Sequence, residues 1–376
     1  MRHTFRKSDT GRAPLRVAAN LVVLFFASSA QAQFAESIEK ARVKHDLPGV
    51  AIGLLKVDEK PIIAVAGVRK RGDIAKVEAT DQWHLGSNTK PITALLFALL
   101  VDLGLIDWDT PLAEIFPEEA KKWPPNLRKV SPRHLLTHTS GLPTLGPLER
   151  FQAERSDKET PLEDRASLMK SLADVKLIGE PGTKYEYSNL GYVVLGAIID
   201  RRGKASWEEQ IGARVFTPLG IKKWGVGPAG KNDPWPHEKN GTPLADADVR
   251  DNSPIYNSAG RLHMSIADYQ RILAETLRIA NRESTLVKPA TAKKLMEAPF
   301  AASPHVLGGW IAVRNAADPK KIALTHDGSN TLNYCTAWIV PGEKMAFCCM
   351  TNQARAGHRV CEELSKSILK RFGVEP

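Results

Sequence analysis

After its first 32 residues, this chain of 376 residues has no apolar run long enough to suggest a membrane span, no internal repeat and no low-complexity tract. No run of Lys and Arg with interleaved aromatic residues occurs, so nothing indicates nucleic-acid binding. No spacing of Cys and His suggests zinc. What is left is a globular chain of ordinary composition, long enough for one large domain or two lobes.

Residues 1–32 have the pattern of a secretory signal. A basic start precedes an apolar run at about 17–30, and Ala30, Gln31 and Ala32 form a small-x-small cleavage site. The run is short for a membrane span of about 20 residues. We expect a signal peptide at 1–32 and a periplasmic or secreted domain at 33–376, with no stable membrane insertion after cleavage. An uncleaved membrane anchor is the alternative.

Removing that segment takes away five basic residues and Asp9, so the formal charge falls from +10 to +6. Such a charge supports only a mild attraction to anionic surfaces.

The four cysteines all lie near the C-terminus: Cys335, Cys348, Cys349 and Cys361. An exported chain permits disulfides, and three pairings are possible. Cys348 and Cys349 are neighbours on a predicted strand and should point to opposite faces. Buried free thiols are the alternative.

Strand patterns occur at both ends of the chain. Apolar, β-branched runs lie at 50–57 and 62–68, and again at 306–313, 322–325, 334–340 and 345–350. Helical patterns lie at 34–45, from Pro91 to about Leu105, at 266–279 behind the capping residue Ser265, and at 359–371.

Between the two groups of strands the chain has helices and loops, including a long loop at 227–254. We predict an α+β fold in which one sheet is assembled from both termini. Its α/β lobe covers about 33–95 and 300–376, and a helical lobe covers about 96–299. A cleft commonly forms at such a boundary.

Ser87 and Lys90 form the first candidate catalytic pair. A serine hydroxyl needs a base to become a nucleophile, and a lysine three residues later on a helix lies on the same face. Lys90 could serve as that base only if burial or a cation lowered its pKa. The helix that follows Ser87 is apolar on all sides, unlike the surroundings of the other three Ser-x-x-Lys sequences at Ser37, Ser167 and Ser367. A helix cap followed by a solvated lysine is the structural alternative.

Tyr187, Ser188 and Asn189 lie in a loop at the start of a predicted helix. Tyr187 could share a proton with Lys90 and protonate a leaving group. Asn189 could bind a substrate amide. The alternative is a core tyrosine followed by a capping asparagine.

His326, Asp327 and Gly328 end a short apolar strand. Gly328 allows a ligand to approach the backbone, and the N–H of Ser329 could then form an oxyanion hole with the N–H of Ser87. His326 could polarise Tyr187 or contact the leaving group. An ordinary strand-end loop is the alternative.

His134 and His138 have the i, i+4 spacing of a helical metal pair, but Leu135 stands where that motif requires Glu, and no third ligand is evident. We therefore interpret both histidines as structural, and we predict no metal and no cofactor.

The order of these three motifs resembles the penicillin-recognising serine hydrolases, which include class C β-lactamases, D-alanyl-D-alanine carboxypeptidases, D-aminopeptidases and related esterases. Segments 83–90, 130–141 and 260–265 are also similar, and the likeness spans about 34–372. The resemblance implies a β-lactamase/transpeptidase-like fold, with a five-stranded antiparallel sheet flanked by helices and a mostly helical lobe. It also implies acylation of Ser87 followed by hydrolysis, without a cofactor.

The third motif departs from that family, where many members have Lys-Thr-Gly. Here His326 and Asp327 replace the lysine and threonine that help bind a substrate carboxylate. If Asp327 faces the site, it repels a carboxylate by about 1 kcal/mol in water-like surroundings and more when desolvated. That would favour neutral esters or cationic amines, but strand alternation could equally turn Asp327 away.

The sequence therefore predicts a serine hydrolase acting on a small or peptide-like ester or amide. Its catalytic residues would be Ser87, Lys90 and Tyr187, with Asn189, His326, Asp327, Gly328 and Ser329 binding substrate. A β-lactamase or D-alanyl-D-alanine carboxypeptidase is the alternative within the same chemistry. A non-catalytic protein that binds cell-wall fragments is the alternative of another class. Oligomeric state is left open.

Overall fold

The structure, a computed structural model, describes residues 29–145, 160–245, 251–314 and 322–374. Most of the predicted signal segment falls outside these residues. Its last four residues open helix α1 (Ser29–Lys44), which begins earlier than the predicted helix at 34–45.

The main sheet has six antiparallel strands in the order β2-β1-β9-β8-β7-β6. Strands from both ends of the chain therefore share one sheet, as predicted. The bounds are β1 Gly49–Lys56, β2 Ile62–Gly67, β6 Ile311–Arg314, β7 Ile322–Ser329, β8 Tyr334–Val340 and β9 Met345–Thr351.

The sheet has one strand more than the five that the family resemblance implied, and one strand for each of the six patterns in the sequence. Strand β6 is shorter than the predicted run at 306–313. Gly309 has a φ of +77°, so the chain turns there and only the residues after Trp310 pair with β7.

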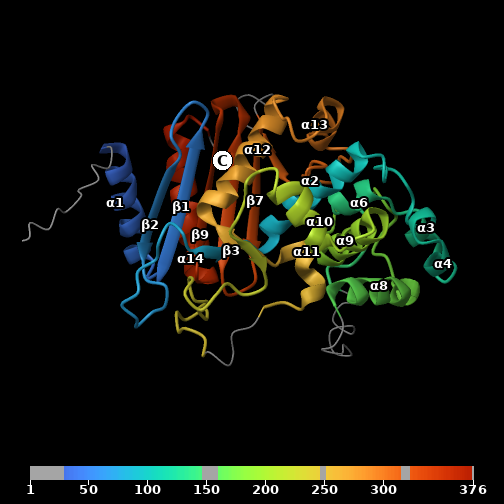
Figure 1. Cartoon of the computed structure of the whole chain (residues 1–376), viewed down its shortest axis with the longest axis horizontal. Coiled ribbons are helices and arrows are strands. Elements are labelled where there is room, and N and C mark those ends of the chain that lie inside the picture. Colours follow the sequence, from blue (N-terminus) through green and yellow to red (C-terminus); the bar gives the residue numbers. More distant parts are fainter. Residues whose placement is uncertain (1–28, 146–159, 246–250, 315–321, 375–376) are drawn as a thin grey trace, which may run out of the picture.

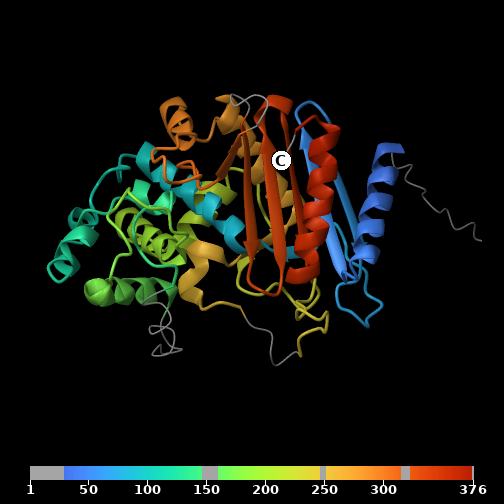
Figure 2. The same ribbon diagram turned by 180° about the vertical axis from the view of Figure 1, so that it is seen from behind.

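Two helices cover the outer face of the sheet. These are α1 and α14 (Ala354–Arg371), which lie side by side on that face (Figure 2). Their apolar stripes, including Ile38 and Val360, pack against Ile52 and Phe347 of the sheet. This outer core is separate from the larger one on the inner face.

The inner face packs against α12 (Ile266–Asn281), while α2 (Thr89–Asp102) runs from the sheet into the helical part (Figure 1). Ser265 caps α12 by accepting a hydrogen bond from the Asp268 N–H at 3.1 Å. Although α12 lies within the range predicted for the helical lobe, it packs on β1, β8 and β9 of the main sheet.

The remaining helices form a cluster beside the sheet, with α9 buried at its centre (Figure 1). Their bounds are α3 Leu112–Ile115, α4 Pro117–Ala120, α5 Pro125–Arg128, α6 Pro132–Leu136, α8 Pro161–Ser171, α9 Asn189–Gly203, α10 Trp207–Ile211, α11 Asn257–Gly260 and α13 Pro289–Leu295. A separate small sheet has the strand order β3 (Gln82–His84), β5 (Leu262–Ser265) and β4 (Trp224–Val226). Within the described ranges, no helix combines the length and apolar character needed to span a membrane.

The four cysteines are free and buried. Cys348 belongs to the inner core and Cys349 to the outer core, so the two side chains point to opposite faces of β9, as predicted. The Cys361 thiol lies 3.7 Å from the Cys349 carbonyl oxygen.

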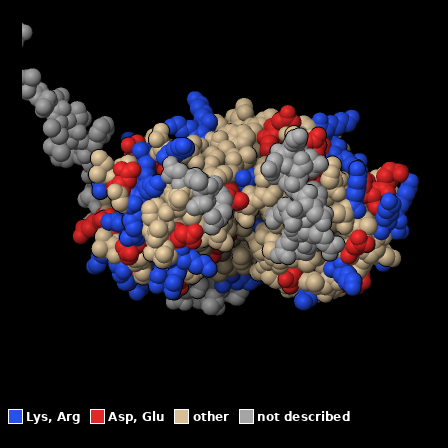
Figure 3. Space-filling view, turned by 90° about the horizontal axis from the view of Figure 1, so that it is seen from below, with Lys and Arg blue, Asp and Glu red and all other residues tan. Residues whose placement is uncertain are grey.

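Positive and negative side chains are intermingled on the face of the molecule that Figure 3 shows. The described residues on this face therefore do not gather into a large patch of one sign.

Candidate active site

Ser87 lies in a short turn of 3₁₀ helix, η1 (Gly86–Asn88), and Lys90 lies in the first turn of α2 that follows directly. The two side chains project from the same side, and Lys90 Nζ is 3.0 Å from Ser87 Oγ. Pro91 fits in this first helical turn because the backbone nitrogens there lack intrahelical partners. The apolar helix α2 buries Lys90, whereas Ser87 is only half-buried.

Lys90 is completely buried, and burial lowers its pKa well below the ordinary 10.5. Its Nζ also lies 2.8 Å from Asn189 Oδ1 and 2.7 Å from the Ala259 carbonyl oxygen. A neutral amine has two N–H groups and one lone pair. Both oxygens can only accept, so they take the two N–H groups, and the lone pair is left for the Ser87 hydroxyl. This is the arrangement of a general base and its nucleophile.

Tyr187 lies on the other side of the same amine, with its ring centroid 4.8 Å from Lys90 Nζ. It precedes α9, which is capped by the Ser188 hydroxyl at 2.9 Å from the Gly191 N–H. Burial raises the pKa of Tyr187 and outweighs a hydrogen bond with the Ser87 side chain, which lowers it. The phenol therefore keeps its proton at neutral pH and can donate it.

Strand β7 approaches η1 so closely that only glycine fits at the contact. An added Cβ at Gly328 would lie 2.0 Å from the Leu85 carbonyl oxygen and 2.8 Å from the Ser87 nitrogen. From the other side, a Cβ at Gly86 would lie 2.3 Å from the Ser329 nitrogen. The backbone nitrogens of Ser87 and Ser329 are thus brought together beside Ser87 Oγ.

This end of β7 has a free edge. Strand β6 pairs with β7 only at Ile322–Thr325, and among the described residues no other strand pairs with the later part on that side. From His326 to Ser329, the side of β7 away from β8 therefore has no strand partner within the described residues, and η1 packs against it there.

The structure separates His326 from Asp327, because neighbouring residues on a strand face opposite ways. His326 is buried on the inner face, with its ring centroid 6.5 Å from that of Tyr187. Asp327 lies on the outer face and lines a cavity of about 240 Å³ together with Tyr334 and residues of α14. Asp327 therefore does not join the residues around Ser87, and its predicted contact with substrate is corrected.

The His326 imidazole is uncharged at neutral pH, because burial, followed by the nearby His305 and Lys90, lowers its pKa well below the usual 6.5. Its Nδ1 donates to the Asp327 carbonyl oxygen at 2.7 Å, and its buried Nε2 has no hydrogen-bond partner among the described residues.

Two histidines that the sequence did not mark as functional complete the surroundings of Tyr187. His138 stacks on Tyr187 with centroids 4.3 Å apart, and its Nδ1 accepts from the Ser188 N–H at 3.0 Å. His305 is fully buried, 4.8 Å from His138 and 6.1 Å from His326 between ring centroids. Burial, with a smaller effect of Lys90, lowers the pKa of His305 to about 4.

These neutral rings exclude water around Lys90 and Tyr187. In the sequence, His138 stands out only through its spacing from His134, which resembles that of a metal-binding pair. The sequence around His305 contains no motif that indicates a function. In the parts of the chain that the structure describes, no group of three or more His, Cys, Asp or Glu is arranged to hold a metal ion.

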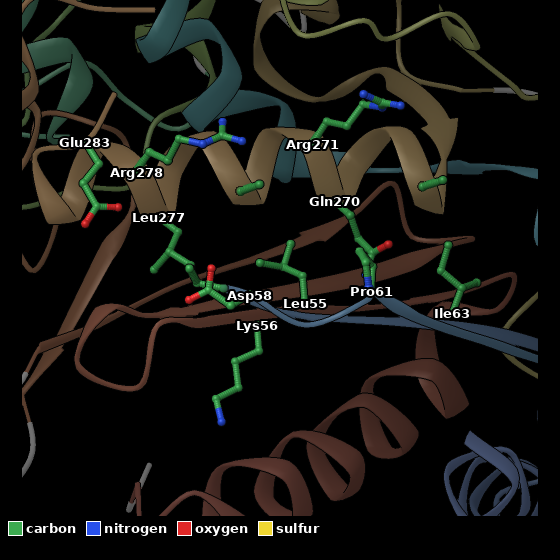
Figure 4. A pocket seen from close by; sticks show the side chains of 13 residues that line it. Leu55, Lys56, Asp58, Pro61, Ile63, Gln270, Arg271, Leu277, Arg278 and Glu283 are labelled. Carbon is green, nitrogen blue, oxygen red and sulfur yellow. The ribbon is translucent and has the colours of Figure 1, made fainter. Parts of the chain in front are cut away.

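A larger cavity, of about 740 Å³, lies elsewhere. It is bounded by α12 on one side and by β1, β2 and their connecting turn on the other, with Leu277 and Leu55 both projecting into it (Figure 4). It contains none of the predicted site residues.

A model of the Beta-lactamase family matches residues 34–369. The chain therefore belongs to this family, whose members are serine hydrolases, and the membership supports an enzyme.

The protein is similar to penicillin-binding protein 4 of Amycolatopsis lactamdurans, with 30% identity over 190 residues. That match covers 50% of this chain and 48% of the relative, so the chain spans about half the length of that relative.

Two solved structures share the fold. The D-amino acid amidase from Ochrobactrum anthropi SV3, complexed with L-phenylalanine, has 20% identity and a TM-score of 0.70, covering 90% of this chain and 100% of that one. A class C β-lactamase mutant has 17% identity and a TM-score of 0.73, covering 91% and 99%. The predicted β-lactamase/transpeptidase-like fold is confirmed.

The close approach at Gly328 can be tested by Gly328→Ala. The added methyl group must push β7 away from η1 and so move the Ser329 N–H away from Ser87. We expect the rate of labelling by a serine-directed fluorophosphonate to fall at least about 100-fold, the typical cost of one lost oxyanion donor. Gly342→Ala is the matched control, because a Cβ there meets nothing within 4 Å. Equal labelling of the two variants would contradict the geometry.

Proposed function

We propose that this protein is an exported serine hydrolase that cleaves ester or amide bonds through an acyl-enzyme on Ser87. The observation that carries the proposal is the hydrogen bonding of Lys90. Its Nζ lies within hydrogen-bond distance of two acceptors, Asn189 Oδ1 and the Ala259 carbonyl oxygen, and of Ser87 Oγ, so in the neutral amine the two acceptors take the N–H groups and the lone pair faces the nucleophile. Export is supported by the signal-like sequence at 1–32.

In the acylation step, Ser87 Oγ attacks the carbonyl carbon and its proton passes to Lys90 Nζ. The negative charge that develops on the carbonyl oxygen is stabilised by the N–H groups of Ser87 and Ser329. The bond to the leaving group then breaks. The leaving alcohol or amine takes the Tyr187 proton, and Tyr187 recovers one from Lys90.

Deacylation uses the same groups in reverse. Water attacks the Ser87 ester and gives a proton to Tyr187, which passes its own phenolic proton to Lys90. The bond to Oγ then breaks, Lys90 returns that proton to Ser87 Oγ, and the carboxylic acid leaves. The nearby neutral rings of His138 and His305 keep the amine in a low-dielectric setting in which it remains an effective base.

The substrate class is inferred from residue 326, the position at which many family members have a lysine. Here a neutral His326 stands there, and Asp327 points away. The site therefore neither attracts a carboxylate at this position nor repels it. This favours uncharged esters and amides, with Asn189 and the free edge of β7 as contacts for a substrate amide.

A β-lactamase or D-alanyl-D-alanine carboxypeptidase is the second candidate. It is supported by the resemblance to a penicillin-binding protein and to the fold of a class C β-lactamase. A non-catalytic protein that binds cell-wall fragments is a weaker candidate, because Ser87, Lys90 and Tyr187 are all in place.

Ser87→Ala is expected to abolish hydrolysis of an activated ester such as a p-nitrophenyl ester, and to abolish fluorophosphonate labelling, because no other group holds the nucleophile's position. Ser167→Ala, in another Ser-x-x-Lys sequence, is the matched control and should retain both. Unchanged turnover after the Ser87 substitution would end the serine-hydrolase proposal. A wild-type protein that takes no label would favour the non-catalytic alternative.

The pH dependence tests Lys90 as the base. A base must be unprotonated, so kcat/KM should rise with pH through the pKa of Lys90 and then level off. Because burial lowers that pKa well below 10.5, the rise should be centred well below pH 10. Lys90→Arg should be inactive at every pH, since a guanidinium stays charged, whereas Lys170→Arg should match the wild type. A rise centred near pH 10 would contradict the assignment.

Intact-mass measurements with a penicillin separate the two candidate substrates. We expect neither a lasting adduct on Ser87 nor rapid appearance of hydrolysed drug, since His326 gives the drug's carboxylate no cation to bind. A lasting adduct would indicate a penicillin-sensitive peptidase. Fast hydrolysis would indicate a β-lactamase.

A further inference from the structure

A buried carboxylate, Asp251, connects three elements around the proposed site. Its side chain is fully buried, and Oδ2 lies 2.8 Å from His84 Nε2 in β3. The same oxygen accepts from Arg261 Nε at 3.3 Å, just after α11. The other oxygen, Oδ1, accepts from Asn330 Nδ2 at 3.2 Å, just after β7, and from the neighbouring Asn252 N–H at 2.8 Å.

On one side, Asp251 acts through His84 on the turn that carries Ser87. The Gly86 N–H donates to His84 Nδ1 at 3.1 Å, so Nδ1 is the acceptor and Nε2 carries the proton given to Asp251. Gly86 has a φ of +53° and directly precedes Ser87. The carboxylate therefore fixes the tautomer and orientation of the ring, and the ring fixes the turn.

On the other side, Asp251 holds the loop that follows Ser329. Asn330 gives its amide N–H to Asp251, while its Oδ1 accepts from the N–H groups of Leu332 at 3.2 Å and Asn333 at 2.9 Å. Ser329 Oγ donates to the Asn333 carbonyl oxygen at 2.8 Å. The backbone on both sides of Ser329 N is therefore held in one position relative to Asp251.

We propose that Asp251 is a positioning residue that sets the separation between the Ser87 and Ser329 N–H groups, and so builds the oxyanion hole through His84 and Asn330. The inference rests on the proposed function, because it assigns these N–H groups to a developing oxyanion. Asp251 itself touches no reacting group. Arg261 offsets its charge in the interior, which allows an ionised carboxylate to accept from both sides at once.

Asp251→Asn tests the proposal with little change of shape. An amide keeps one acceptor oxygen and presents an NH₂ where the other stood, so it cannot accept from both His84 and Asn330. We expect kcat for an activated ester to fall about 100-fold with little change in KM, as for the loss of one oxyanion donor. Asp81→Asn is the matched control. It removes the same charge from a buried carboxylate paired with Arg69 at 2.6 Å, three residues before His84.

The specific readout is the ratio of kcat/KM for an ester and for the matching thionoester, in which sulfur replaces the carbonyl oxygen. Sulfur is a weak acceptor and fits an oxyanion hole poorly, so a well-formed hole favours the ester. The ratio should collapse toward that of the uncatalysed reaction in Asp251→Asn and stay at the wild-type value in Asp81→Asn. A fall in kcat with an unchanged ratio would overturn the proposal, since a loss of folded protein lowers both rates equally.

Hydrogen exchange separates this proposal from the proposed function. In Asp251→Asn, the amides of 84–88 and of 328–333 should both exchange faster, whereas Asp81→Asn should leave them unchanged. If the wild type cleaves no ester, the hydrolase proposal fails, and exchange alone decides whether Asp251 links the two segments. Faster exchange in only one segment would overturn the link.

If Asp251→Asn does not fold, Asn330→Asp replaces it. That change keeps the acceptor for the Leu332 and Asn333 amides but removes the N–H donor to Asp251. The same collapse of the ester-to-thionoester ratio is expected, and an unchanged ratio would refute the proposal.

Discussion

The site depends on the burial of one amine. Lys90 extends from α2 to a point where α9 supplies Asn189 and α11 supplies the Ala259 carbonyl oxygen. A fully buried ammonium without a counter-ion costs several kcal/mol, so burial lowers the pKa of Lys90 and makes its proton easier to lose. The helices that remove water from Lys90 thus also prepare it to accept a proton from Ser87. The packing of these helices therefore also sets the proton affinity of the Lys90 amine.

The second constraint is the closeness of β7 to η1. Two glycines, Gly86 and Gly328, let two backbone segments meet where any side chain would force them apart. One segment belongs to the entrance of α2 and the other to a strand near the end of the chain. The geometry beside Ser87 is therefore made by long-range packing, and neither segment could hold it alone.

Many of the strands and the Ser87–Lys90 pair could be predicted from the sequence, because their sequence patterns are local. Alternation and β-branching marked the strands at both termini, and an apolar helix behind Ser87 distinguished its Ser-x-x-Lys from the other three. The strand at 306–313 was predicted too long because its glycines were not read as a turn. Whether Asp327 faces the site was left open, because strand alternation says that neighbouring side chains diverge but does not say which of them faces the site.

His305 and Asp251 could not have been found in this way. Each lies in a loop without a motif, and each meets its partners only through the tertiary fold. His84 lies in the segment 83–90 that is similar to the family, yet its role depends on a carboxylate 167 residues away in the chain. Such positions become visible only when the packing of distant segments is known.

The last four residues of β7 form an open sheet edge, and such edges tend to pair with strands of other molecules and so to aggregate. Here the exposed stretch is short, and η1 packs directly against it. A second chain could not add a strand at Gly328 without displacing the turn that holds Ser87. The contact that shapes the site thus also protects the edge, and the protein keeps a free strand edge with little risk to its solubility.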